Sequence, residues 1–155
     1  MYIEHLAIWC NDLEKMKQFY CTYFNAKANN KYHNSSKNFS SYFLSFETGP
    51  RLELLAMPEI TQNVNDSTQQ YTGLIHFAFS AGSKEKVNQL TEQLRANGYL
   101  IAGESRTTGD GYYESVILDP EGNRIELLFR FKWPLFIILC FKKINNNTNS
   151  YNCKS

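Results

Sequence analysis

The sequence lacks any strong imbalance of charge, and it has no apolar stretch long enough to span a membrane. Its 155 residues include 16 Lys and Arg against 15 Asp and Glu, so the formal net charge is +1. Because the two signs are interspersed, we expect no basic surface for nucleic acid or anionic lipid. The apolar stretch at residues 133–141 is far shorter than the roughly 20 residues of a transmembrane helix. We therefore expect a small-molecule substrate, with neither nucleic acid nor membrane as a partner.

Cysteine is scarce, and its spacing is that of neither a metal site nor a disulfide framework. The four cysteines are Cys10, Cys21, Cys140 and Cys153, with no CxxC pair among them. This pattern is typical of reduced thiols in a reducing compartment. The N-terminus also lacks a basic segment followed by an apolar one, which is the pattern of a secretory signal. Both features predict a cytoplasmic protein.

The length of the chain is sufficient for one hydrophobic core. We predict a single domain over residues 1–129, with a polar linker at residues 58–71. Residues 130–155 form a C-terminal extension whose Asn-rich end is predicted to be flexible. Residues 135–141 are apolar enough to need cover, so we expect them to pack on the domain or a partner subunit, unless the tail is a species-specific or aberrant extension.

Hydrophobic periodicity and turn residues predict a strand, a helix and three further elements in each half of the domain. Asn11 opens the first predicted helix, and Glu14 follows three residues later as in a capping box. Ser83 is the predicted N-cap of the second helix. The predicted strands are residues 2–9, 31–33, 41–46 and 51–57 in the first half, and 74–80, 99–103, 113–118 and 124–129 in the second.

The two halves repeat each other in sequence. An offset of 71 residues relates the first strands and helices, and an offset of 73 relates the last strands. The matched pairs are His5/His76, Ala7/Ala78 and Glu14/Glu85 in the first group, and Gly49/Gly122, Arg51/Arg124 and Glu53/Glu126 in the second. The chain is therefore predicted to be an α+β protein made of two tandem βαβββ units, at about residues 1–57 and 72–129.

Four residues at matched repeat positions are candidate metal ligands: His5, His76, Glu53 and Glu126. A carboxylate inside an apolar strand is costly to bury unless it is paired, hydrogen-bonded or bound to a metal. Taken alone, a strand histidine is more often a core or surface residue, and a strand glutamate more often pairs with Arg or Lys on a neighbouring strand. The repetition favours a shared site for a divalent cation such as Zn, Ni, Co, Mn or Fe. His33 has no matched residue and is interpreted as a solvated loop histidine.

Three segments resemble the vicinal oxygen chelate superfamily, which includes glyoxalase I, extradiol dioxygenases and bleomycin-resistance proteins. They are IEHLA at residues 3–7, LIHFAF at 74–79 and DPEGNRIEL at 119–127, and the resemblance extends over residues 2–129. It implies a cupped, barrel-like mixed sheet with the helices outside, and a homodimer. Within the superfamily, the order His, Glu, His, Glu is most similar to bacterial glyoxalase I.

That resemblance implies a metal-dependent lyase or isomerase acting on a small substrate with vicinal oxygens. A divalent metal held by the four candidate ligands would stabilise an enediolate. Glu126 would move a proton between adjacent carbons, while Glu53 would be a ligand or a second base. Two alternatives remain: an extradiol dioxygenase or thiol transferase of the same fold, and a non-catalytic protein that sequesters a drug or metabolite. The presence of a fourth ligand, the acidic residue Glu53, weighs against the first alternative. The intact set of four ligands weighs against the second.

The substrate pocket departs from that of bacterial glyoxalase I at two positions. Trp9 and Met57 stand where the bacterial enzyme has an arginine and an asparagine that contact glutathione. Loss of a cationic and an amide contact argues against tight recognition of glutathione carboxylates. We predict a pocket that prefers an apolar or aromatic substrate, with Trp9, Phe77 and Phe79 as wall residues, although Phe77 and Phe79 equally suit an ordinary sheet core.

Overall fold

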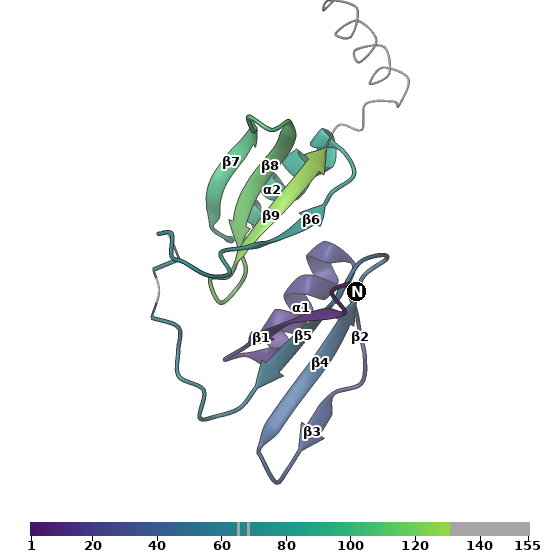
Figure 1. Ribbon diagram of the computed structural model, residues 1–155, viewed down its shortest axis with the longest axis vertical. Helices are drawn as coiled ribbons and strands as arrows, with labels where there is room; N and C mark the ends of the chain where they lie inside the picture. Colours follow the sequence, from purple (N-terminus) through teal and green to yellow (C-terminus); the bar gives the residue numbers. More distant parts are fainter. Residues whose placement is uncertain (65, 68, 131–155) are drawn as a thin grey trace, which may run out of the picture.

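A computed structural model describes residues 1–64, 66–67 and 69–130 of the chain. Within these residues the strands form two separate sheets, each accompanied by one helix (Figure 1). None of the described helices is long and apolar enough to cross a membrane. The predicted packing of residues 135–141 concerns residues outside this range.

The first unit contains a mixed sheet of five strands. Its elements are β1 (His5–Trp9), α1 (Leu13–Phe24), β2 (Lys27–Ala28), β3 (Tyr32–Asn34), β4 (Phe39–Ser45) and β5 (Arg51–Ala56). The strand order is β1-β5-β4-β2, and β3 also pairs with β4. β1 runs parallel to β5, whereas the other pairs are antiparallel. As a result, β1 is an edge strand that has only β5 as a neighbour within the described residues.

The second unit repeats this arrangement with four strands. Its elements are β6 (Phe77–Ser80), α2 (Lys84–Ala96), β7 (Ile101–Thr107), β8 (Tyr112–Leu118) and β9 (Arg124–Arg130). The strand order is β6-β9-β8-β7, with β6 parallel to β9 and at the edge. The α+β prediction and the tandem βαβββ units are thereby confirmed, since β2 and β3 both pair with β4 and together correspond to β7 beside β8. The strands form two open, cupped sheets and do not close into one barrel.

The helix boundaries follow from their caps. Asp12, one residue after the predicted start, is the N-cap of α1, and its side chain accepts a hydrogen bond from the Lys15 amide at 2.9 Å. Ser83 caps α2 as predicted, accepting from the Lys86 amide at 3.2 Å. The side chain of Asn11, the predicted cap, does not cap the helix: its amide group donates to the Glu121 carboxylate at 3.1 Å.

One apolar core joins the two units, and α1 lies at its centre. Leu52 and Leu54 of β5 and Ile125 and Leu127 of β9 are all buried in it. The aromatic residues of α1 reach into the second unit: the ring centroids of Phe24 and Phe79 are 4.4 Å apart, and those of Phe19 and Tyr99 are 4.9 Å apart. The face of each sheet that carries these buried residues is called the helix-covered face, and the opposite face is called the open face.

Candidate metal centre

The N-terminal pair consists of His5 and Glu53. Parallel pairing of β1 with β5 sets Ala7 opposite Glu53. His5 lies two residues before Ala7 and therefore on the same face of the sheet. The distance from His5 Nε2 to the nearer carboxylate oxygen of Glu53 is 3.7 Å. Glu53 lies between two buried leucines, so strand alternation directs its side chain to the open face.

The C-terminal pair, His76 and Glu126, has nearly the same geometry. His76 Nε2 lies 3.3 Å from a carboxylate oxygen of Glu126. The histidine side chains are 39% and 38% exposed in the two pairs, and both glutamate side chains are 17% exposed. The sequence repeat therefore extends to the position and exposure of the four side chains that the sequence singles out.

Within one chain the two pairs stay apart. Among the residues that the structure describes, no group of three or more His, Cys, Asp or Glu side chains is close enough to hold a metal ion. The reason lies in the packing: the helix-covered faces of both sheets contribute to the same core, so the open faces with Glu53 and Glu126 are directed away from it. One chain thus presents two separate His–Glu pairs, each with one imidazole and one carboxylate.

The pKa of Glu126 is influenced by burial and by several neighbouring charges. Partial burial raises its pKa, and the nearby Glu114 carboxylate adds to that rise, while His76 and Arg106 oppose it. Glu114 itself is buried on β8, where Arg106 of β7 lies 3.3 Å away. No sequence pattern marks Glu114, since only the pairing of β8 with β9 brings it diagonally across from Glu126.

The predicted pocket residues divide between the two faces. Trp9 lies on the open face, 43% exposed, with its ring 6.1 Å from that of Phe39 in an edge-to-face contact. Phe77 and Phe79 pair with Ile125 and Leu127 on the helix-covered face, where both pack against Tyr20 of α1. Phe77 and Phe79 therefore pack against the core and do not line a pocket on the open face. An ordinary core position was the alternative that the sequence allowed.

The remaining predicted positions can be placed as well. Met57 is the residue directly after β5 and is half-buried. His33 lies in β3, exposed, with Nδ1 2.9 Å from the Ser40 hydroxyl oxygen. Cys10 is a buried free thiol, and burial raises its pKa to about 12. Cys21 is the other free thiol among the described residues, and it is half-buried.

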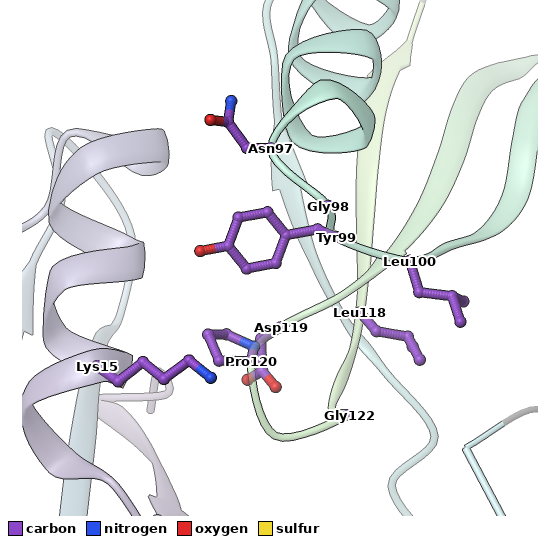
Figure 2. Close-up of a pocket in the computed structure, with 9 residues that line it drawn as sticks. All are labelled: Lys15, Asn97, Gly98, Tyr99, Leu100, Leu118, Asp119, Pro120 and Gly122. Atoms are coloured by element: carbon purple, nitrogen blue, oxygen red, sulfur yellow. The ribbon is translucent and has the colours of Figure 1, made fainter.

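A hollow of ≈ 370 Å³ lies between α1 and the segment that follows α2 (Figure 2). Lys15, Tyr99 and Pro120 are among its lining residues, and none of the four predicted ligands is. Figure 2 shows the Tyr99 ring and the Lys15 side chain reaching into the gap between the two units. The hollow lies at the junction of the two units, and its lining includes no residue of either His–Glu pair.

Comparison with known proteins identifies the family and the fold. The family model described as Glyoxalase/Bleomycin resistance protein/Dioxygenase superfamily matches residues 2–127. The uncharacterized protein YqjT of Bacillus subtilis is 42% identical over 59 residues, which make up 36% of this chain and 46% of that protein. The match thus spans about half the length of this curated relative.

Solved structures with the same fold include both uncharacterised and enzymatic proteins. A glyoxylase/bleomycin resistance protein/dioxygenase domain from Frankia sp. EAN1pec superposes with a TM-score of 0.70 at 17% identity, covering 84% of this chain and 98% of that one. The trypanothione-dependent glyoxalase I of Leishmania major gives 0.65 at 20% identity, covering 97% and 99%. Glyoxalase I of Zea mays gives 0.68 at 23% identity, covering 86% and 46%. At these identities the likeness concerns the fold.

Proposed function

Because the chain belongs to the Glyoxalase/Bleomycin resistance protein/Dioxygenase superfamily, we propose that it is a divalent-metal-dependent lyase or isomerase of the glyoxalase type. The observation that carries the proposal is the matched pair of half-sites, His5 with Glu53 and His76 with Glu126, which agree in exposure and nearly in distance. Two imidazoles and two carboxylates form a donor set that suits Zn, Ni, Co, Mn or Fe.

The complete site is proposed to form between two copies of the chain. Each copy offers one half-site per open face, and the shared core keeps the two faces of one copy apart. Among the described strands, β1 and β6 each pair with one neighbour only, so the other edge of each strand is open to a second copy. Ile3 and Leu74, at matched repeat positions beside these edges, are 64% and 80% exposed. Exposed apolar residues next to an edge strand favour an interface with a second copy.

The residues of the assembled site would divide the chemistry between them. When bound, the metal supplies positive charge that stabilises an oxyanion on a substrate with vicinal oxygens. Glu126, half-buried beside His76, would take a proton from the carbon next to that oxygen and return it to the neighbouring carbon. Glu53 occupies the equivalent position in the other half-site and completes the donor set or serves as the second base.

The open face of the first sheet favours a substrate with an aromatic or apolar group. Trp9, Phe39 and Tyr32 form a chain of edge-to-face contacts with ring centroids 6.1 and 6.2 Å apart. Trp9 is four residues along β1 from His5, which corresponds to about 13 Å. A substrate whose reactive oxygens lie at the half-site can therefore extend an apolar group along the strand to this aromatic surface. Neither Trp9 nor Met57 offers the charge or amide that would fix a glutathione carboxylate.

A complementation experiment tests the shared site directly. Variant N carries His5→Ala and Glu53→Ala, and variant C carries His76→Ala and Glu126→Ala. Neither homodimer has an intact site, so neither should bind Co²⁺ tightly. After unfolding and refolding the two variants together, each mixed dimer regains one complete site, formed by the intact residues of each copy. Random assortment makes half of the dimers mixed, so about one quarter of a Co²⁺ ion per chain is expected by titration.

The controls decide between the proposed arrangement and its alternatives. Wild-type protein refolded in the same way should bind about one Co²⁺ per chain, and mixed variants with no recovery would mean that the site is not shared. Absence of metal binding by the wild type, even after reconstitution, would overturn the metal-dependent activity. Turnover is assayed on 2-oxoaldehyde thiol adducts that carry aromatic groups. Oxygen consumption by Fe²⁺-loaded protein with catechols would instead establish the dioxygenase chemistry.

A further inference from the structure

The surroundings of His5 differ from those of its repeat partner in one respect that bears on the site. The Nδ1 atom of His5 lies 2.5 Å from a carboxylate oxygen of Glu4, while its Nε2 atom is directed toward Glu53. We propose that Glu4 is a positioning residue, which holds the His5 ring and its tautomer so that Nε2 carries the free lone pair. The inference rests on the proposed metal-dependent function and adds a residue to it.

Glu4 is in turn fixed from the other side by Arg51. The Arg51 Nε atom donates to the second carboxylate oxygen of Glu4 at 2.8 Å, and the terminal guanidinium nitrogen donates to the same oxygen. The backbone reinforces the contact, since the Arg51 amide donates to the Glu4 carbonyl at 3.0 Å. The two oxygens of one carboxylate thus bind two different partners, and neither His5 nor Arg51 can turn without breaking a charge-assisted hydrogen bond.

Phe43 completes the support beneath both partners. Its ring lies edge-on to the His5 ring with centroids 5.4 Å apart, and the Arg51 guanidinium carbon is 4.1 Å from its centroid. Phe43 is opposite Glu53 in the β4–β5 register, so this support is attached to the strand that carries the carboxylate of the pair. His5, Glu4 and Arg51 therefore form a network on a single aromatic ring.

Within the part of the chain that the structure describes, the second unit has no counterpart of this network. The offset that maps His5 onto His76 places Ile75 at the position of Glu4, and the isoleucine side chain has no group that accepts a hydrogen bond. Arg124, the repeat partner of Arg51, donates to the backbone carbonyl of Ser67 at 2.9 Å instead. Duplication thus preserved the donor atoms on both sides, while a carboxylate behind the histidine is present on one side only.

A carboxylate behind a ligand histidine has two consequences for metal binding. It accepts the Nδ1 proton, which leaves Nε2 unprotonated in the neutral ring, and it raises the basicity of that nitrogen. Loss of such an outer partner typically lowers metal affinity about 10- to 100-fold. His5 is therefore expected to be the pre-organised ligand of the assembled site, and His76 the ligand that adjusts when the metal binds.

The test compares full-length wild type with Glu4→Gln, using Co²⁺ as the probe. Titration with a competing chelator should show about 10- to 100-fold weaker Co²⁺ affinity in the variant. Nitrogen NMR of the metal-free protein at pH 8 should show His5 as the Nδ1–H tautomer in wild type and a mixture in Glu4→Gln, with the His76 signals unchanged. A purely structural role of Glu4 would alter stability but would not select the His5 signals.

Glu92→Gln is the matched control. Glu92 is also an exposed carboxylate that pairs with an arginine, Arg95, but it lies on α2 and belongs to neither His–Glu pair. Its substitution removes the same charge and should leave Co²⁺ affinity unchanged within about twofold, since an exposed ion pair contributes little. Wild-type affinity and an unchanged His5 tautomer in Glu4→Gln would overturn the positioning role and leave the metal site intact. Absence of Co²⁺ binding by the wild type would overturn the proposed function, and the positioning role with it.

Discussion

The hydroxyl of Tyr20 in α1 donates a hydrogen bond of 2.9 Å to the carboxylate of Asp119, 99 residues further along the chain. Both residues are buried, and Asp119 begins the turn that leads into β9. The same turn supplies Glu121, whose two oxygens accept from the Asn11 and Asp12 amides at the start of α1, both at 2.8 Å. The turn before the Glu126 strand therefore holds the two units together.

Replacing Tyr20 with phenylalanine should weaken this junction without removing its apolar contacts. The Asp119 carboxylate loses one donor in a buried setting, and a hydrogen bond to a charged group contributes about 1.5–3 kcal/mol. Since the Asn123 and Glu121 amides still donate to Asp119, we expect the free energy of unfolding to fall by about 1–2 kcal/mol. Urea unfolding measures this. Tyr113→Phe, which removes an exposed hydroxyl bond to Asn88, is the control and should cost less than about 0.5 kcal/mol.

The same contact predicts a pH dependence of stability. Burial raises the pKa of Asp119 above its ordinary value, although the Asn123, Glu121 and Tyr20 donors oppose the rise. Between the ordinary and the raised pKa, the folded state binds more protons than the unfolded state. Lowering the pH through that window should therefore increase the contribution of Asp119 to the free energy of unfolding. In Tyr20→Phe the window should extend to higher pH, since a donor that lowers the pKa of Asp119 is lost. Urea unfolding of both proteins across pH 4–7 measures this. An unchanged window would contradict the role of the contact.

Glu121→Ala tests the other half of the junction. The substitution leaves two amides at the start of α1 without their acceptor and removes a negative charge near the positive end of the helix dipole. Loss of an N-terminal cap costs about 0.5–2 kcal/mol, and we expect a decrease in that range by urea unfolding. Glu47→Ala removes an exposed carboxylate from the turn before β5 and should change stability by less than about 0.5 kcal/mol. Equal effects of the two substitutions would contradict the capping role.

Much of the fold could be predicted because its signals are local and repeated. The two βαβββ units follow from strand and helix patterns, and Ser83 was identified as a cap from the sequence alone. The predicted start of α1 was wrong by one residue: the Asn11 side chain donates to Glu121, 110 residues away in the sequence, and Asp12 caps the helix instead. The arrangement as two open sheets could not be foreseen either, since it depends on how α1 packs between the units.

The candidate site shows the same division between local and distant information. The repeat offsets relate equivalent positions in the two units, so they predicted that the four ligands match. In the structure these residues lie in two matched pairs. Glu114 and Arg51 act on these pairs through strand pairing, and no sequence pattern marks that pairing in advance. The position of Glu4 beside His5 and the isoleucine at the equivalent position could have indicated the positioning role. Whether Phe77 faces the pocket or the core needed the register of β6 with β9.

The thiol of Cys10 should resist alkylation in the folded protein. Its pKa of about 12, raised mainly by burial, leaves about one thiolate in ten thousand at pH 8. Cys21 is only half-buried. A brief pulse of iodoacetamide at pH 8, followed by peptide mass spectrometry, should therefore label Cys21 at least about 100-fold faster than Cys10. In urea both should react at similar rates, and equal rates in the folded protein would show that the Cys10 region opens readily.

Glu126→Gln separates the chemical role of this residue from its structural cost. Partial burial raises the pKa of Glu126, so its ionised form is less favourable in the metal-free folded state than in the unfolded chain. The neutral isostere should therefore unfold at an equal or higher temperature than wild type when no metal is present. With Co²⁺ added, wild type should gain stability and the variant should gain much less, because a metal ligand is missing.

Turnover of Glu126→Gln should fall by about 10²- to 10⁴-fold, the usual contribution of a general base. Glu53→Gln is the matched variant on the other half-site. Similar metal loss with a smaller loss of turnover at saturating Co²⁺ would identify Glu126 as the base, and equal losses of turnover would contradict a distinct role for Glu126.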